Sequence, residues 1–144
     1  MLILNHILMA ETILFRELSY QITGICFKVH NDLGRFCSER QYSDKLEESL
    51  REHKISHKRE FELSKLVSSP LGNRPDFIIE NKIILDAKAK KFITKEDYFQ
   101  MMRYLTAANF KLGLIVNFRN TYLKPQRVVN NRFIPNSCHS RESN

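Results

Sequence analysis

Apolar residues recur at helical spacing in three stretches of the chain, which predicts three amphipathic helices. The first helix is expected over residues 17–33, and Gly34 directly after it suits a helix C-terminus. The second helix is expected to begin at Ser38, because Ser38 and Gln41 have the types and spacing of a capping box. Its apolar face carries Tyr42, Leu46 and Leu50, with His53 at the edge.

The third helix is expected to run from Thr94 to about Asn109, since Thr94 and Asp97 have the spacing of a second capping box. Its core stripe is expected to consist of Tyr98, Met101, Met102 and Leu105. Gln100 and Tyr104 stand four residues apart and therefore share an adjoining face of this helix.

Glu39 is an exception to the polarity of the second helix. At about 100° per residue it falls on the same face as Leu46 and Leu50, whereas Asp44 and Glu48 point the other way. A carboxylate on a buried face is unfavourable unless it is paired or binds a metal ion. The alternative is that Glu39 only interacts with the helix dipole in the first turn.

Five strands are expected at about residues 58–67, 74–80, 82–89, 111–118 and 124–129. A turn over residues 68–73, rich in serine, proline and glycine, separates the first two. The run from Leu112 to Val116 has no charged residue and predicts a buried strand. The order helix, helix, three strands, helix, two strands predicts an α/β fold with a mixed sheet flanked by helices.

The length of 144 residues fits one domain, which we expect over residues 1–134. Residues 135–144 are polar and are expected to form a disordered tail. No apolar run approaches the roughly 20 residues of a membrane span, so no membrane partner is expected. The apolar first residues lack the basic leader and cleavage site of a signal peptide. Three scattered cysteines without a C-x-x-C pair predict reduced thiols and a cytoplasmic location.

Positive charge is concentrated in the last third of the chain. The formal net charge is +7, yet residues 1–97 are nearly balanced, with 16 basic and 15 acidic side chains. The segment from Tyr98 to Arg141 contains basic residues and no Asp or Glu. Such one-sided charge favours polyanions through counterion release, although a basic, solvated surface would have the same composition.

The candidate chemistry lies in the hairpin predicted from the second and third strands. Side chains alternate along a strand, so Asp86 and Lys88 share one face. Asp76 joins them only if it lies opposite Asp86. A three-residue loop over residues 80–82 gives this register, and Asn81 tolerates the left-handed conformation that such a loop favours. A two-residue loop would turn Asp76 to the other face.

Two carboxylates and a lysine in this arrangement indicate a metal site that hydrolyses phosphodiester bonds. Such hydrolysis needs a dication at the phosphate, an activated water and a stabilised leaving oxygen. Mg²⁺, or Mn²⁺, is held by one or two carboxylates together with water and substrate oxygens, which Asp76 and Asp86 can match. Lys88 can orient the water or stabilise charge in the transition state. The alternative is an exposed row of charges without function.

Three short motifs resemble those of the PD-(D/E)XK nuclease superfamily, in its RecB-like branch: Pro75-Asp76, Asp86-Ala87-Lys88 and Gln100-x-x-x-Tyr104. More narrowly, the chain resembles the small GxxExxY family within that superfamily. The resemblance extends from about Leu18 to Val129 and implies a restriction-endonuclease-like core. Glu39 and Tyr42 match the glutamate and tyrosine of the family motif, whereas Phe36 stands where the family has glycine.

The resemblance also implies roles for individual residues. The metal ligands would be Glu39, Asp76 and Asp86. Lys88 would act on the attacking water, and Gln100 would hold a water or a phosphate oxygen beside the metal, with Tyr104 packing or hydrogen bonding nearby. The family often has glutamate where Asp86 stands, so a metal here would lie closer to the strand. The expected partner is nucleic acid, and DNA in particular.

Basic residues near these motifs are candidates for contacts with backbone phosphates, which position a nucleic acid without reading its sequence. They are Arg74, Lys90, Lys91, Arg103, Arg119 and Lys124. Two alternatives to a Mg²⁺-dependent nuclease stay open. One is a nucleic-acid-binding module of the same fold that no longer cuts. The other is an interaction protein that forms a homodimer through the stripe of Tyr98, Met101 and Leu105.

Overall fold

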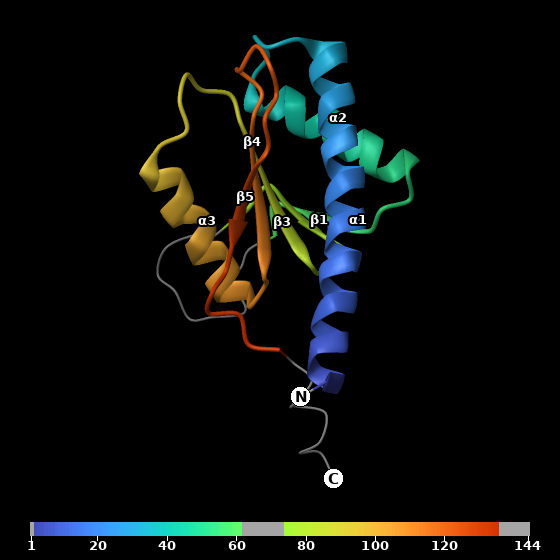
Figure 1. The fold of residues 1–144 in the computed structure, drawn as a ribbon. Helices are drawn as coiled ribbons and strands as arrows, with labels where there is room; N and C mark the ends of the chain where they lie inside the picture. Colours follow the sequence, from blue (N-terminus) through green and yellow to red (C-terminus); the bar gives the residue numbers. More distant parts are fainter. Residues whose placement is uncertain (1, 62–73, 136–144) are drawn as a thin grey trace.

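The computed structural model describes residues 2–61 and 74–135, with side chains from residue 15 onward (Figure 1). Its helices are α1 (Leu2–Leu33), α2 (Glu39–Glu52) and α3 (Lys95–Ala108). Its strands are β1 (His57–Arg59), β2 (Phe77–Ile79), β3 (Ile83–Lys88), β4 (Leu112–Asn117) and β5 (Gln126–Val129). They form one sheet in the order β1-β2-β3-β4-β5, in which β3 and β4 are parallel and the other neighbours antiparallel. The predicted mixed α/β architecture is therefore confirmed.

The sheet lies between two layers of helices, with α1 and α2 on one face and α3 on the other (Figure 1). The larger core, on the side of α1 and α2, contains Ile83, Leu85 and Ala87 of β3. Ile84 belongs to the smaller core under α3. Because alternate residues of β3 point to opposite faces, Asp86 and Lys88 lie on the α3 side.

Several elements differ in length from the sequence prediction, and β2, expected over residues 74–80, covers only Phe77–Ile79. Helix α1 begins at Leu2 rather than at residue 17, and residues 2–16 contain no Pro or Gly that would end a helix. Strand β1 ends at Arg59, because Glu60 adopts a left-handed backbone conformation with φ of 51°. Residues 62–73, including the predicted turn, and residues 136–144 of the predicted tail lie outside the described residues. Within the described residues, no helix combines the length and the apolar character that crossing a bilayer requires.

The register of the β2–β3 hairpin agrees with the prediction. Its pairs are Phe77 with Leu85, Ile78 with Ile84, and Ile79 with Ile83. Residues 80–82 therefore form a three-residue loop, in which Glu80 and Asn81 have φ of 54° and 52°. Continuing the pairing by one residue places Asp76 opposite Asp86, as the loop length predicts.

Helix α3 packs its apolar stripe against the sheet, with one exception. Met101 and Leu105 are fully buried in the core below α3, so they are covered within a single chain. Tyr98 was predicted in the same stripe, and this prediction is wrong: its side chain is 39% exposed and its hydroxyl donates a hydrogen bond to Gln126. Tyr98 lies in the first turn of α3, where the hydroxyl reaches the start of β5.

The connection from α1 to α2 is held by the buried side chain of Tyr42. Gly34 ends α1 with φ of 76°, a conformation that favours glycine. The Tyr42 hydroxyl donates to the carbonyl oxygen of Gly34 at 2.5 Å and accepts from the backbone N–H of Cys37 at 3.2 Å. The Tyr42 ring stacks on Phe118 with ring centroids 4.3 Å apart. This side chain therefore ties the α1–α2 connection to the end of β4.

Gly113 of β4 allows α3 to approach the sheet closely. A Cβ atom on Gly113 would collide with Sδ of Met101 and lie 2.8 Å from its Cγ. Because Met101 is fully buried, we expect Gly113→Val to lower the free energy of unfolding by about 1–3 kcal/mol. Urea unfolding measures this loss. The double variant with Met101→Ala should recover part of it, and additive losses would contradict the close contact.

Candidate active site

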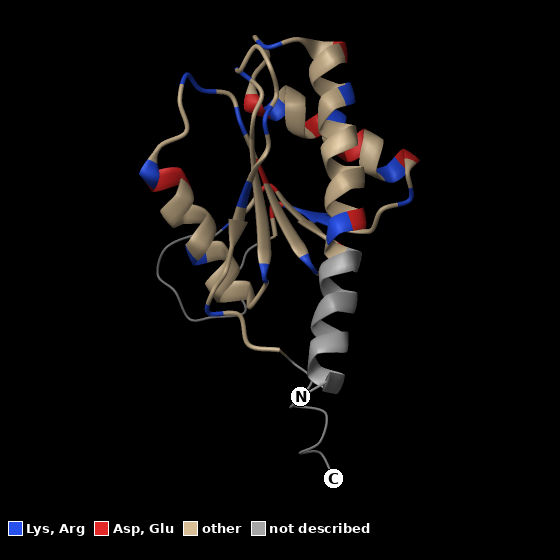
Figure 2. Cartoon of the chain, viewed as in Figure 1, with Lys and Arg blue, Asp and Glu red and all other residues tan. Residues whose placement is uncertain are grey.

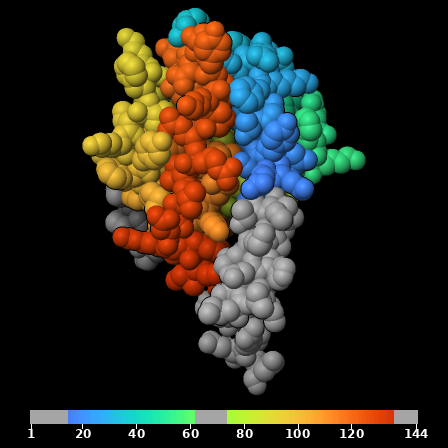
Figure 3. Space-filling model, in the orientation of Figure 1, coloured from blue at the N-terminus to red at the C-terminus, as the bar shows by residue number. Residues whose placement is uncertain are grey.

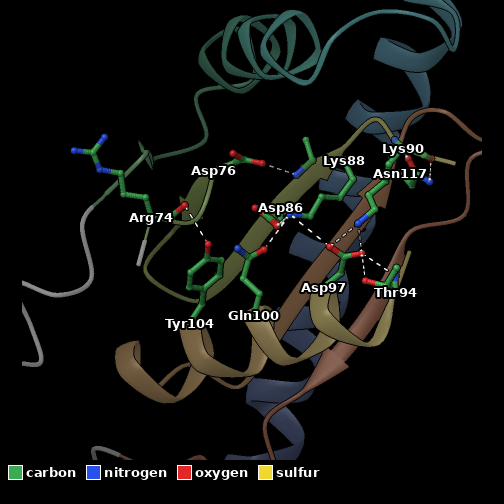
Figure 4. A network of polar contacts seen from close by, with 11 residues as sticks. Arg74, Asp76, Asp86, Lys88, Lys90, Thr94, Asp97, Gln100, Tyr104 and Asn117 are labelled. Carbon is green, nitrogen blue, oxygen red and sulfur yellow. Dashed lines mark hydrogen bonds and ion pairs between the residues drawn. The ribbon is translucent and has the colours of Figure 1, made fainter. Parts of the chain in front are cut away.

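Asp76 and Asp86 form a carboxylate pair at the end of the hairpin (Figure 4). Oδ2 of Asp76 accepts a hydrogen bond of 2.7 Å from the backbone N–H of Ala87, which fixes its side chain against β3. Asp86 is almost fully buried, with 5% of its surface exposed. Burial, together with the charge of Asp86 nearby and a hydrogen bond with it, raises the pKa of Asp76 to about 8. The pair therefore retains a proton at neutral pH when no metal ion is bound.

Lys88 lies between Asp86 and helix α3. Its Nζ donates to Oδ2 of Asp86 at 2.7 Å and to Oε1 of Gln100 at 3.0 Å (Figure 4). Burial lowers the pKa of Lys88, but the carboxylate of Asp86, and more weakly those of Asp97 and Glu39, outweigh this and raise it. Lys88 is therefore a charged hydrogen-bond donor in the metal-free site.

Asp97 connects the site to a second lysine. Thr94 N–H donates to Oδ2 of Asp97 at 2.7 Å, as expected for the predicted capping box, but Lys90 Nζ also donates to that oxygen at 2.8 Å. Burial raises the pKa of Asp97, and the bonds from Lys90 and Thr94 more than reverse this, so the pKa is lowered. Asp97 Oδ1 lies 4.0 Å from Lys88 Nζ. The sequence pattern indicated only the cap.

The side chain of Asn117 fixes the backbone of Lys90 through two hydrogen bonds. This side chain accepts from the N–H of Lys90 at 3.1 Å and donates to the carbonyl oxygen of Lys90 at 2.7 Å. Asn117 is the β4 partner of Lys88 in the parallel register. The position of Asn117 after a buried apolar run was the signal available in the sequence, and it was missed.

Glu39 lies away from the buried face on which it was predicted. It is exposed in the first turn of α2, whereas Leu46 and Leu50 are buried. Glu39 was correctly predicted to share the angular position of Leu46 and Leu50 around α2, but the first turn of α2 extends beyond the core. Glu39 instead lines a cavity of about 710 Å³ together with Asp76. Arg40 and Arg59 line the same cavity, and sequence reasoning missed both.

Tyr104 contacts the chain segment that precedes Asp76. Its ring is buried in the core under α3, and its hydroxyl donates to the carbonyl oxygen of Arg74 at 3.3 Å. Arg74 stands two residues before Asp76, so Tyr104 holds the segment that leads into β2 (Figure 4). This contact fits the packing and bonding role expected for Tyr104.

The chemistry of the donor set fits a hard divalent cation. The paired carboxylates of Asp76 and Asp86 repel each other, and a cation would relieve the repulsion that raises the pKa of Asp76. Among the residues whose side chains are described, no three His, Cys, Asp or Glu side chains are close enough to hold one ion. The structure thus brings Asp76 and Asp86 together, with Lys88 and Gln100, and leaves Glu39 outside this group.

The basic residues predicted to contact phosphates lie in different surroundings. Lys90 is paired with Asp97, while Lys91 and Arg119 line a second cavity at the ends of β3 and β4. Arg103 is exposed on α3, and Lys124 is exposed before β5. Figure 2 shows basic residues on the loops at the end of the sheet where β3 and β4 finish.

This sheet order, with Asp86 and Lys88 on a strand of the hairpin and Gln100 on the following helix, is that of a restriction-endonuclease-like protein. A sequence model of the PD-(D/E)XK nuclease superfamily matches residues 16–130, and the chain belongs to this superfamily. This match confirms the predicted superfamily, whose members are generally nucleases. We found no match among curated proteins or among solved structures.

Proposed function

We propose that the protein is a nuclease that uses a divalent metal ion, Mg²⁺ or Mn²⁺, to hydrolyse phosphodiester bonds in nucleic acid, with DNA as the expected substrate. The observation that carries the proposal is the position of Lys88. Its ammonium group lies 2.7 Å from a carboxylate oxygen of Asp86, on the strand that Asp76 faces. A phosphate near this group would meet a fixed cation beside two acidic ligands.

Asp76 and Asp86 would hold the metal ion in this proposal. When bound, the ion would neutralise charge on the phosphate and lower the pKa of a bound water. Glu39 acts from the wall of the adjoining cavity, as an acceptor for water or as a further ligand if α2 moves closer. The GxxExxY family and the RecB-like branch are predictions that fit this assignment.

Lys88 and Gln100 would supply hydrogen bonds to the phosphate and to the attacking water. The Lys88 ammonium donates hydrogen bonds to the negative charge that develops on the phosphate in the transition state. Oε1 of Gln100 and Oδ2 of Asp86 each accept one Lys88 hydrogen and thereby fix the direction of the third. The amide NH₂ of Gln100 can donate to a water or to a phosphate oxygen. Asp97 keeps Lys90 close by for the backbone of the nucleic acid.

Metal removal tests the proposal directly. Purified full-length protein treated with EDTA should leave single-stranded, duplex and flapped DNA intact, and added Mg²⁺ or Mn²⁺ should restore cleavage. Gel analysis of end-labelled DNA measures this, with a single-stranded RNA as a further substrate. Asp86→Asn should lose the activity, whereas Asp32→Asn, on the exposed end of α1, should keep it. Intact substrates at every metal concentration would contradict the proposal.

A binding module without catalysis is the second candidate. It is favoured by the lack of a three-ligand group among the described side chains and by the basic loops around the site. DNA binding that weakens steeply with salt, without cleavage in any metal, would support this candidate.

A further inference from the structure

Three loops meet at the end of the sheet where β3 and β4 finish (Figure 1). They connect α1 to α2, β3 to α3 and β4 to β5. In Figure 3 the orange β4–β5 loop packs against the cyan α1–α2 loop, with the yellow β3–α3 loop beside it. Together they line an open cavity of about 500 Å³. The residues that matter for the argument are Arg35, Phe36, Lys91, Phe92, Arg119 and Tyr122.

The floor of this loop cavity is fixed. Arg35 Nε donates to the carbonyl oxygen of Arg119 at 2.9 Å, and Arg119 Nε donates to that of Arg35 at 3.1 Å. His30 Nε2 contacts the carbonyl oxygen of Asn120 at 2.9 Å. Phe118, which directly precedes Arg119, stacks on Tyr42, and the Tyr42 hydroxyl donates to the carbonyl oxygen of Gly34. The α1–α2 and β4–β5 loops are therefore held together before any ligand arrives.

Aromatic rings project from this floor into solvent. Phe36 and Phe92 are each 75% exposed, and Tyr122 is 87% exposed. Large exposed aromatic side chains are unfavourable in water, and three at one cavity indicate a surface that binds something flat and apolar. The guanidinium groups of Arg35 and Arg119 lie over the Phe36 ring, at 4.9 and 5.6 Å from its centroid.

The charge of the loop cavity is positive. Arg35, Lys91 and Arg119 line it, and none of its described lining residues is acidic. Rings that can stack, interleaved with cations, match a polyanion whose bases are accessible. In a duplex the faces of the bases are stacked on each other, so only an unpaired strand can offer them to Phe36, Phe92 or Tyr122.

Residues that line the loop cavity stand close in the sequence to residues of the candidate active site. Lys91 follows Lys88 by three residues, which limits their Cα atoms to about 11 Å. Phe36 precedes Glu39 by the same number of residues. Phe118 N–H donates to the carbonyl oxygen of Lys88 at 2.8 Å, so the end of β4 and Arg119 are fixed beside Lys88.

We propose that the loop cavity binds unpaired nucleotides next to the bond that is cut, so that the substrate class is single-stranded nucleic acid or the single-stranded arm of a flapped duplex. This rests on the proposed nuclease function for its placement beside a cleavage site. Bases stack on Phe36, Phe92 and Tyr122, and Arg35, Lys91 and Arg119 contact the phosphates that join them. The loop cavity therefore distinguishes unpaired from paired nucleic acid and does not recognise a particular base sequence.

Fluorescence anisotropy with a labelled 20-nucleotide single strand of mixed sequence, and with its duplex, tests this without any cleavage when EDTA is present. Phe36→Ala and Tyr122→Ala should each weaken single-strand binding about fivefold or more, with a smaller effect on the duplex. Phe36→Trp should retain binding, because tryptophan also stacks. Tyr20→Ala, at an 81% exposed position on α1, is the matched control and should leave binding unchanged.

The outcomes separate this proposal from the proposed function. Unchanged single-strand affinity in both alanine variants, or equal losses for single strand and duplex, would overturn the loop-cavity assignment even if the protein cleaves DNA normally. Selective loss of single-strand binding would support it even if the wild-type protein cuts nothing in Mg²⁺ or Mn²⁺. The exposure of both rings makes a folding defect in these variants unexpected, and circular dichroism checks this.

Discussion

Replacing Lys88 by methionine should lower the rate of phosphodiester cleavage by about 10²–10³-fold, the loss expected when one charged donor to the transition state is removed. Methionine keeps most of the length of the lysine side chain and removes its charge. The affinity for nucleic acid should change far less, because Lys88 is one of many cations and most of it is buried. Single-turnover cleavage at saturating Mg²⁺, together with anisotropy for binding, separates the two quantities.

Lys28→Met is a suitable control for this experiment, since Lys28 is exposed on α1. Without its lysine, Asp86 lacks its ion-pair partner beside Asp76, so the variant is best compared with the wild type below its unfolding temperature and with metal present. Wild-type rates in Lys88→Met would remove Lys88 from the chemistry and leave Asp76, Asp86 and Gln100 as candidates.

The metal-free protein should lose stability as the pH rises from about 4 to about 8, and Asp76 is the cause. Its pKa is 3.8 when unfolded and about 8 when folded, so in this window the folded state keeps a proton that the unfolded state has released. Stability then falls with rising pH, on the order of 1 kcal/mol per pH unit. Well below pH 3.8 both states are protonated, and the contribution of Asp76 is fully present.

Urea unfolding in EDTA at several pH values measures this dependence, and Asp76→Asn isolates it. The asparagine can still accept the hydrogen bond from Ala87 N–H but does not titrate. The difference in stability between wild type and variant should therefore shift in favour of the variant as the pH rises, whereas histidine titration cancels in the comparison. A difference that is constant between pH 4.5 and pH 8.5 would contradict the raised pKa. Added Mg²⁺ should stabilise the wild type most at high pH, where the carboxylates are charged.

The acidic pair and its lysine could be predicted from the sequence because they depend on local geometry. Strand alternation places Asp86 and Lys88 on one face, and the length of the loop after Ile79 sets the register of Asp76. Both follow from a short segment and from rules that tertiary packing rarely changes. The placement of Gln100 beside the site needed one further step, the position of α3 over β3, which the resemblance to a family supplied, whereas the hydrogen bond from Lys88 to Gln100 was not predicted.

The features that were missed depend on contacts between distant segments. Helical periodicity gives the angle of Glu39 but not how far along α2 the core extends, so its exposure was not predictable. Asp97 has a complete local explanation as a cap, and its bond to Lys90 depends on the path of the β3–α3 loop. Arg35 and Arg119 stand 84 residues apart in the chain, and their paired hydrogen bonds leave no pattern in the sequence.

The parallel pairing of β3 with β4 has a consequence for the order of folding. Asp86, Lys88, Gln100 and Asn117 all belong to one strand–helix–strand unit, residues 83–117, whose ends are brought together by a short chain segment. Closing a short segment loses less chain entropy than closing a long one, and the loop over residues 80–82 is shorter than the segment that joins β3 to β4. The hairpin can therefore set Asp76 opposite Asp86 before β4 pairs with β3, and Glu39 arrives only when α2 docks onto the sheet. The nascent protein would bring its two carboxylates together early, before α3 and β4 cover the face on which they lie.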